Sequence, residues 1–136
     1  MASDSASGWR YMLSDLDFDE SEASAVLEVL NSKWLSMGPK TKEFEKAFGQ
    51  YADVPYALAT SNCTTALHLA LVSLGIGEGD EVIVPSLTFA ATSNAVLYTG
   101  AKPVFADIIA LDNPLIDSQD IAKKISKNTR AIIVMH

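Results

Sequence analysis

The segment SNCTTALHLAL, residues 61–71, places five small polar residues directly in front of an apolar stretch with helical spacing. One capping residue is enough to begin a helix, so the additional hydroxyl and amide groups need a second explanation. Unpaired backbone N–H groups at a helix start attract anions, and Thr64, Thr65 and Asn62 would supply further donors. Two interpretations remain open from this segment alone: a well-capped helix start with extra Asx and Ser turns, or an anion site of the kind that holds a phosphate.

A second polar segment, PSLTFAAT at residues 85–92, follows the next predicted strand and carries Phe89 at the expected helix start. A core phenylalanine more often follows apolar neighbours, whereas Phe89 lies among small polar ones. Its ring either packs under its own helix or stacks on a flat ligand. Phosphate donors and a stacking ring at neighbouring strand ends together suit a phosphorylated aromatic ligand.

Motifs for other kinds of site are absent or misplaced in this sequence. It contains no G-x-G-x-x-G and no Walker motif. The glycine-rich segment GIGEGDE precedes a strand and carries acidic residues that repel phosphate, so we expect a turn there. Two histidines and one cysteine at scattered positions give no metal-ligand spacing, and we expect no metal. We expect His68 to be structural and Asp107 to be a turn or cap residue, whereas His136 has the stronger functional claim because it ends a strand.

The elements that position these segments follow from the hydrophobic pattern. The spacing predicts helices over 17–32, 39–51, 64–74, 88–98 and 118–127, and strands over 56–61, 81–85, 102–108 and 130–136. Strands and helices alternate, and the strands are continuous apolar runs, so the predicted fold class is α/β, with three α/β/α layers around a largely parallel sheet. Ligands of such sheets bind at the carboxyl ends of the strands, where both polar segments lie.

The last predicted strand reaches residue 136 with no helix after it to cover its free side. We therefore expect residues 17–136 to be the N-terminal part of a longer domain. Residues 1–16, rich in Ser, Ala and Asp, are expected to form a flexible N-terminal segment.

Composition narrows the class of protein. The chain has 136 residues, 49% hydrophobic and 20% charged, as in globular proteins with a core. A net charge of −7 with no Lys/Arg run of three or more argues against nucleic-acid binding, and no apolar run approaches the length of a membrane span. The N-terminus lacks the pattern of an export signal, and a single cysteine fits a reducing compartment, so we expect a cytoplasmic location.

Four segments together resemble the N-terminal part of the DegT/DnrJ/EryC1/StrS aminotransferases: NSKWLSMGPKTKEFEKAF, SNCTTALHLAL, GIGEGDEVIVPSLTFAATSNAVLYTGAKPVFADI and TRAIIVMH. The resemblance covers the chain from about residue 17 onward, in matching order and spacing. Members of this family are homodimeric pyridoxal-phosphate enzymes of the aspartate aminotransferase fold (fold type I) that aminate nucleotide-linked keto-sugars. The resemblance therefore implies part of that fold's large domain, pyridoxal 5'-phosphate as cofactor, a nucleotide-sugar substrate, an amino-acid amine donor such as glutamate, and a homodimer.

The resemblance also implies roles for particular residues. The family's Ser/Asn…Thr turn cradles the cofactor's phosphate, an aromatic residue stacks on its pyridine ring, and a Trp-x-x-x-Gly-Pro loop lies near the substrate pocket. The commonest family cradle has glycine where this chain has cysteine. The small cysteine side chain still lets the backbone approach the phosphate closely, provided that the backbone at this position does not require a positive φ. The cofactor-binding residues expected on this basis are Thr64, Thr65, Asn62, Cys63 and Phe89, and the substrate-binding residues are Trp34, Gly38 and Pro39.

The catalytic lysine is the part of the family pattern that this chain lacks. By resemblance, the lysine that binds the cofactor as a Schiff base is expected beyond His136, and none of the ten basic residues here takes its place by motif. We therefore expect no catalytic residue within these residues, and the 136-residue chain alone to be inactive. Two alternatives remain open: a dehydratase of the same family that replaces the lysine, and a non-catalytic fragment or binding module with the same fold.

Overall fold

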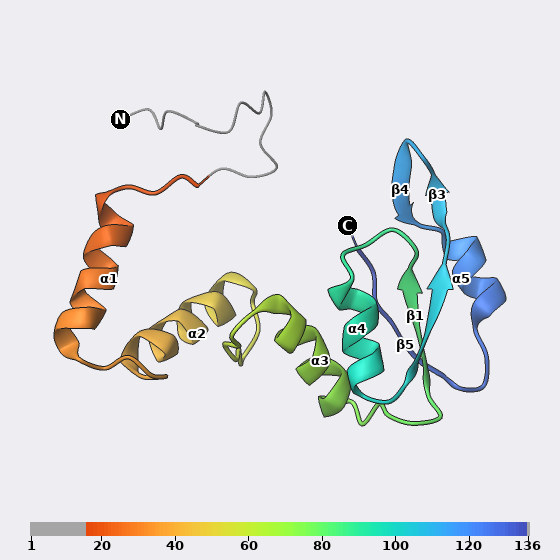
Figure 1. Cartoon of the computed structure of the whole chain (residues 1–136), viewed down its shortest axis with the longest axis horizontal. Helices are drawn as coiled ribbons and strands as arrows, with labels where there is room; N and C mark the ends of the chain where they lie inside the picture. The colour runs from red at the N-terminus through yellow and green to blue at the C-terminus, as the bar shows by residue number, and fades with distance from the viewer. Residues whose placement is uncertain (1–15, 136) are drawn as a thin grey trace. The chain divides into compact units, whose positions relative to one another are not determined.

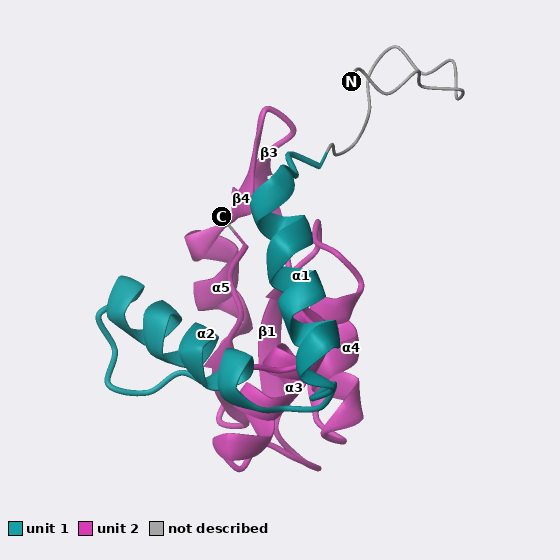
Figure 2. Ribbon diagram, turned by 90° about the vertical axis from the view of Figure 1, so that its left-hand side faces the viewer, with its two compact units in different colours: residues 1–57 teal, residues 58–136 magenta. Residues whose placement is uncertain are grey.

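The computed structural model describes residues 16–135, which fall into two compact units, 1–57 and 58–136 (Figure 2). Each unit is described by itself below. Residues 1–15 of the segment predicted to be flexible, and His136, lie outside the described residues.

The first unit consists of two helices (Figure 1). Helix α1 spans Glu20–Ser32 and begins with a capping box, in which the Asp19 side chain accepts a hydrogen bond from Ser21 N and the Glu22 side chain accepts one from Asp19 N. Helix α2 spans Pro39–Tyr51, with the ring of Pro39 in the first turn, where no N–H is needed. The prediction of a helix over 39–51 is confirmed.

The predicted strand over residues 56–61 is wrong, because this segment forms no strand in the structure. A strand needs a neighbour for its backbone hydrogen bonds, and none of the strands in the described part of the chain pairs with this segment. Its apolar side chains are correspondingly uncovered: Tyr56 is 90% exposed and Leu58 is 68% exposed. Helix α3, Cys63–Ser73, follows directly.

A parallel three-stranded sheet forms the centre of the second unit. Strand β1 (Glu81–Pro85) lies between β2 (Lys102–Ala106) and β5 (Thr129–Ile132), and both neighbours run parallel to it. The central strand is the buried one, with Val82, Ile83 and Val84 fully inaccessible. The predicted α/β class with a parallel sheet is confirmed.

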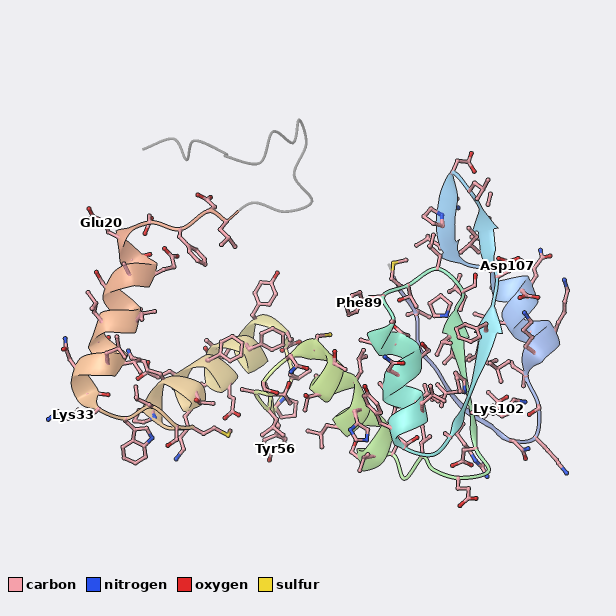
Figure 3. All side chains as sticks on the ribbon, in the orientation of Figure 1. Glu20, Lys33, Tyr56, Phe89, Lys102 and Asp107 are labelled. Atoms are coloured by element: carbon pink, nitrogen blue, oxygen red, sulfur yellow. The ribbon has the colours of Figure 1, made fainter. Side chains whose placement is uncertain are left out.

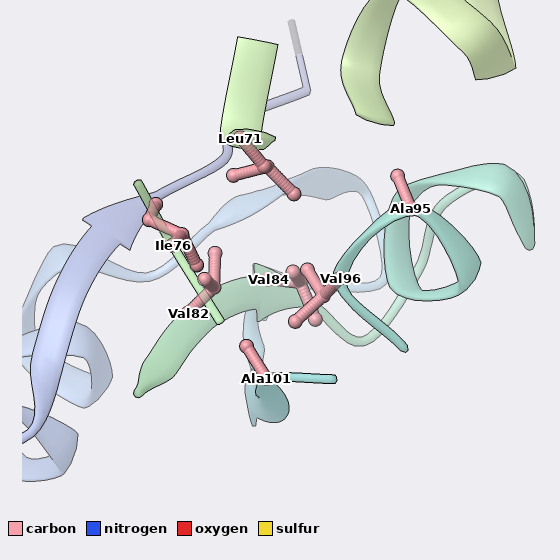
Figure 4. Close-up of a cluster of buried hydrophobic side chains, with 7 residues drawn as sticks. All are labelled: Leu71, Ile76, Val82, Val84, Ala95, Val96 and Ala101. Atoms are coloured by element: carbon pink, nitrogen blue, oxygen red, sulfur yellow. The ribbon is translucent and has the colours of Figure 1, made fainter. Parts of the chain in front are cut away.

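Helices cover the sheet on both sides. Val82 and Val84 point from one face of β1 into a cluster with Leu71 of α3 and Val96 of α4 (Ala91–Tyr98), as Figure 4 shows. Helix α5 (Ser118–Lys124) packs against β2 and lies on the other side of the strands in Figure 1. This layering brings the starts of α3 and α4 into one unit, which is what the predicted site requires.

One element was not predicted at all. Residues 108–116 form an antiparallel hairpin of β3 (Ile108–Ala110) and β4 (Asn113–Ile116), with Ile108 paired to Ile116. The predicted strand over 102–108 accordingly ends two residues early, at Ala106. The hairpin strands are too short for an alternating pattern to show in the sequence.

Candidate functional site

The start of α3 is organised by Asn62. The Asn62 side-chain oxygen accepts two hydrogen bonds from Thr65, one from its backbone N–H at 2.9 Å and one from its hydroxyl at 3.1 Å. The Asn62 amide nitrogen donates to Ser61 Oγ at 3.1 Å, and Ser61 Oγ lies 3.3 Å from Thr65 Oγ1. The structure therefore gathers three of the five small polar residues into one network and fixes the helix start.

This network leaves a different set of donors free. Among the described residues, the backbone N–H groups of Cys63 and Thr64 and the Thr64 hydroxyl have no hydrogen-bond partner. The first turn of α3 contains no acidic residue that would repel an anion. Two free N–H groups, a free hydroxyl and the positive end of the helix dipole suit a phosphate group. The fit of a cofactor phosphate to this turn thus favours Thr64 over Thr65, whose two donors already bind Asn62.

Cys63 is the position at which the family resemblance led us to expect glycine. Its thiol is free and exposed, and Cys63 is not among the described residues with a positive φ. The backbone here therefore does not require glycine, and a cysteine is accommodated without strain.

Phe89 lies just before α4, where Figure 3 labels its side chain. The residue is 80% exposed. The interpretation that this ring packs under its own helix is wrong for this unit, because the ring takes no part in the core. Its backbone carbonyl accepts from Thr92 N, and the Thr88 and Thr92 hydroxyls lie 2.9 Å apart. The structure records no contact between Phe89 and residues 61–65 in the described chain, so stacking on a shared ligand stays a prediction.

The carboxyl ends of β1 and β2 are joined through Asp107. Ser86 Oγ donates to Asp107 Oδ1 at 3.4 Å, and Ile108 N donates to the same oxygen at 2.8 Å, as expected for a turn residue. The Asp120 carboxylate accepts from Asp107 N and from Lys124 Nζ, both at 2.7 Å. The hydrogen bond from Lys124 holds the pKa of the Asp120 carboxyl below its usual value. Lys124 also donates to the Phe105 carbonyl, so it anchors α5 instead of facing solvent freely.

His68 contacts a neighbouring helix, and its structural role stays a prediction. Its ring lies 5.7 Å from that of Tyr98 at an interplanar angle of 72°, an edge-to-face contact that joins α3 to α4. Within the described residues, no group of His, Cys, Asp and Glu could hold a metal ion.

Trp34, Gly38 and Pro39 lie together in the first unit, in the turn between α1 and α2. The Trp34 indole Nε1–H donates to the Met37 carbonyl at 3.2 Å. A side chain on Gly38 would collide with this indole, because an added Cβ would lie 2.7 Å from Trp34 Cδ1. Lys40, in the first turn of α2, contacts Glu28 of α1 at 3.1 Å and Glu43 at 3.3 Å. These hydrogen bonds raise the pKa of Lys40, those with Glu28 most.

Two features of the candidate site were not predicted from the sequence. The Asn62–Thr65 capping network distinguishes two threonines that look equivalent in SNCTT, and the Lys40 bridge reinforces the turn of Trp34. The spacing Asn62-x-x-Thr65 is a capping signal that could have identified the first. The Lys40–Glu28 contact joins two helices and has no local sequence signal. No helix in the described chain is long and apolar enough to cross a membrane.

The chain is similar in sequence to curated proteins that are named for sugar and polysaccharide synthesis. The chain is 48% identical over 122 residues to the GDP-perosamine synthase of Caulobacter vibrioides, an alignment of 87% of this chain and 32% of that protein. It is 46% identical over 116 residues to the spore coat polysaccharide biosynthesis protein SpsC of Bacillus subtilis, covering 85% of this chain and 29% of that protein. The chain thus spans about a third of the length of these relatives.

Solved structures agree with the fold. Spr1654 of Streptococcus pneumoniae, described as a sugar aminotransferase and solved in its PMP form, matches with a TM-score of 0.85 and 35% identity over 93% of this chain and 32% of that one. A GDP-4-keto-6-deoxymannose-3-dehydratase with a trapped PLP-glutamate geminal diamine matches with a TM-score of 0.82 and 28% identity, over 91% of this chain and 33% of that one. Residues 16–136 match the family model throughout, and the chain belongs to the DegT/DnrJ/EryC1/StrS aminotransferase family.

Proposed function

We propose that residues 17–136 form the N-terminal part of the large domain of a pyridoxal-phosphate-dependent aminotransferase. Its substrate is a nucleotide-linked keto-sugar, and its amine donor is an amino acid, glutamate by resemblance. The observation that carries the proposal is the family match over residues 16–136, which includes the hydroxyl-rich start of α3. One relative is named for perosamine synthesis and another for spore coat polysaccharide synthesis, which supports a role in making amino sugars for polysaccharides.

Within this proposal the start of α3 binds the cofactor's phosphate. The backbone N–H groups of Cys63 and Thr64 and the Thr64 hydroxyl donate to it, while Asn62 and Thr65 hold the turn in shape. The exposed Phe89 ring stacks on the flat pyridine ring and shields it from water on that face. When bound, pyridoxal phosphate carries the amino group and withdraws electrons from the reacting carbon. The lysine that would hold it covalently is expected beyond His136.

The Trp34–Pro39 turn is proposed to contact the sugar nucleotide. Its support is the family resemblance of Trp34, Gly38 and Pro39 together with the preformed shape of the turn. We also infer a cytoplasmic homodimer, on the basis of the resemblance and of the single free cysteine. Light scattering of the whole polypeptide tests the dimer, and a monomer at micromolar concentration would contradict it.

A dehydratase of the same family is the second candidate function, because the dehydratase structure matches this chain with a TM-score close to that of the aminotransferase. The two activities differ in their products. In the experiment, the whole polypeptide that contains residues 1–136 is incubated with pyridoxal phosphate, glutamate and a nucleotide-linked 4-keto-6-deoxyhexose. An aminotransferase forms 2-oxoglutarate and an amino sugar in equal amounts. A dehydratase yields a deoxy-keto-sugar without an amino group: the hydroxyl group leaves as water, and glutamate, which supplies the two electrons for this deoxygenation, is released as 2-oxoglutarate and ammonia. An inactive binding module yields neither sugar product.

A further inference from the structure

The connection between β1 and α4, residues 86–90, carries Phe89 and has a buried element at each end. Strand β1 is buried through Pro85, and α4 buries its first two residues, Ala91 and Thr92. The residues between them are exposed or half-buried, and Phe89 is 80% exposed. Because so little of Phe89 is packed, the backbone on either side of its Cα determines where the ring lies.

Thr92 holds this backbone on both sides of the Phe89 Cα. Its backbone N–H donates to the Phe89 carbonyl at 3.0 Å, and its hydroxyl lies 2.9 Å from that of Thr88, the residue before Phe89. The N-cap residue of α4 is Ala90, which makes no side-chain capping hydrogen bond. The loop is therefore joined to the helix start through Thr92 and not through a capping side chain.

Packing alone does not explain the hydroxyl of Thr92. This residue is 7% exposed and is the only buried polar residue in the described part of the chain, 16–135. Burying a hydroxyl costs free energy unless it is hydrogen-bonded, and valine has nearly the same shape without this cost. Over the same residues the recorded partner of the hydroxyl is Thr88, which lies in the loop and not in the core. The loop that it holds therefore explains why a hydroxyl lies at this buried position.

We propose that Thr92 is a positioning residue for Phe89, whose ring it holds in place for stacking on the cofactor. The inference rests on the proposed function, in which Phe89 stacks on the pyridine ring, and adds to it a buried residue that acts through another side chain. Removing the hydroxyl leaves the backbone hydrogen bond to the Phe89 carbonyl in place but releases Thr88. The Phe89 ring then gains freedom that cofactor binding must remove again, which weakens binding.

Binding of pyridoxal phosphate to the whole polypeptide that contains residues 1–136 tests this role. Thr92→Val should weaken binding about fivefold, as expected for one lost hydrogen bond. It should also reduce the visible circular dichroism of the bound cofactor, because a mobile ring no longer gives the cofactor fixed surroundings. Thr92→Ser keeps the hydroxyl and should retain the affinity and the dichroism of the parent. The matched control is Thr99→Val at the other end of α4, where the hydroxyl donates to the Val96 carbonyl, and it should bind as the parent does.

A double-mutant cycle with Phe89→Ala separates a positioning role from a general effect on the fold. If Thr92 acts through the ring, Thr92→Val should change the affinity by less than about twofold once Phe89 is alanine. An equal loss in both backgrounds overturns the proposal, and so does unchanged affinity in either single variant. If Thr92→Val does not fold, Thr88→Val breaks the same hydroxyl pair from its half-buried side and carries the same expectations.

Amide hydrogen exchange without cofactor shows whether Thr92 holds the loop at all. Residues 86–92 should exchange faster in Thr92→Val than in the parent or in Thr99→Val, and unchanged exchange overturns the proposal. A polypeptide that shows these effects but transfers no amino group refutes the aminotransferase and leaves the role of Thr92 standing. An active aminotransferase whose affinity and exchange are unaffected by Thr92→Val refutes the role of Thr92 alone.

Discussion

At the scale of single residues, the structure separates two threonines that the sequence presents as a pair. Thr64 keeps a free hydroxyl in the described chain, whereas the hydroxyl of Thr65 donates to Asn62. In the whole polypeptide we expect Thr64→Val to weaken cofactor binding by about 1–3 kcal/mol, the range for a lost hydrogen bond to a charged group. Fluorescence titration with pyridoxal phosphate measures it. An unchanged affinity for pyridoxal phosphate would show that Thr64 does not bind the phosphate. Thr65→Val is the matched control, and we expect it to lower the stability of the helix.

The fold of the described chain does not explain the exposure of Phe89, which is 80% exposed beside a buried helix face. In the whole polypeptide, Phe89→Ala should lower the affinity for pyridoxal phosphate and perturb its absorption band, because a stacked aromatic surface is lost. Phe89→Trp should be tolerated. If alanine leaves both affinity and spectrum as they are, the ring does not stack on the cofactor.

Gly38 has a steric role that can be measured in the chain as it stands. Because any Cβ at this position would collide with the Trp34 indole, Gly38→Ala should displace the ring and break its hydrogen bond to Met37. The expected result is a red-shifted Trp34 emission and a moved indole N–H resonance in a Trp9→Phe background, in which Trp34 is the sole tryptophan. Gly79→Ala is not a suitable control because its φ is +89°, so we compare Ser36→Ala in the same turn. An indole resonance unaffected by Gly38→Ala contradicts the close packing seen here.

At the scale of elements, patterns that carry their own stabilisation were predicted well. The helix over 39–51 was predicted because Gly-Pro marks its start and an apolar stripe runs along it. The strand over 81–85 was predicted because it is a continuous apolar run of the kind that is buried in a sheet. The segment over 56–61 has the same apolar composition as a strand, yet it lacks a partner in the described chain. Composition shows which segments can pair, whereas pairing itself depends on segments distant in sequence.

The same limit applies to the site. The helix start at residues 61–65 is a local feature, so its anion-binding character could be read from residue types. The distinction between Thr64 and Thr65 depends on which hydroxyl the Asn62 side chain accepts, and the bridge from Lys40 to Glu28 depends on how two helices meet. Neither is encoded in a short window, and both appear only once the backbone is folded.

The turn that leads into β1 gives a prediction for the dependence of stability on pH. The Asp80 carboxylate accepts from Gly77 N at 3.1 Å and from Arg130 Nε at 3.2 Å. These contacts, Gly77 first, lower the pKa of Asp80 in the folded state from 3.8. A lowered native pKa means that the unfolded chain takes up the proton first as pH falls. The stabilisation is therefore present above pH 3.8 and is lost as the pH falls through the lower native value.

Urea unfolding between pH 7 and pH 2.5 measures this contribution. We expect Asp80→Asn to be less stable than the parent at pH 7 and to lose less of its stability in acid. Asp112→Asn, at the tip of the hairpin and without a recorded hydrogen bond in the described chain, is the control and should follow the parent. Parallel pH profiles for Asp80→Asn and the parent contradict the role of this turn.

At the scale of the whole molecule, the described chain leaves much apolar surface uncovered. Apolar residues lie around most of helix α3, yet Leu71 is its only buried residue, and Leu69, Val72 and the C-cap residue Leu74 are 40%, 50% and 71% exposed. A helix that is apolar all round belongs in a protein interior. The 136-residue chain is therefore expected to associate or to bind apolar dyes, as proteins with large exposed apolar patches do.

The last prediction concerns what these 136 residues can do alone. They supply the proposed phosphate and ring contacts, but by family resemblance the lysine that forms the Schiff base is expected beyond His136. A surface lysine such as Lys102, 73% exposed and paired with Glu81, lacks the buried setting that activates a lysine as a nucleophile. We therefore expect purified 136-residue chain, given pyridoxal phosphate and then borohydride, to show only scattered, substoichiometric lysine adducts by mass spectrometry, and to transfer no amino group from glutamate. One stoichiometric adduct at a single lysine, together with amino transfer, would show that a complete site lies within these residues and would overturn the division of the site drawn above.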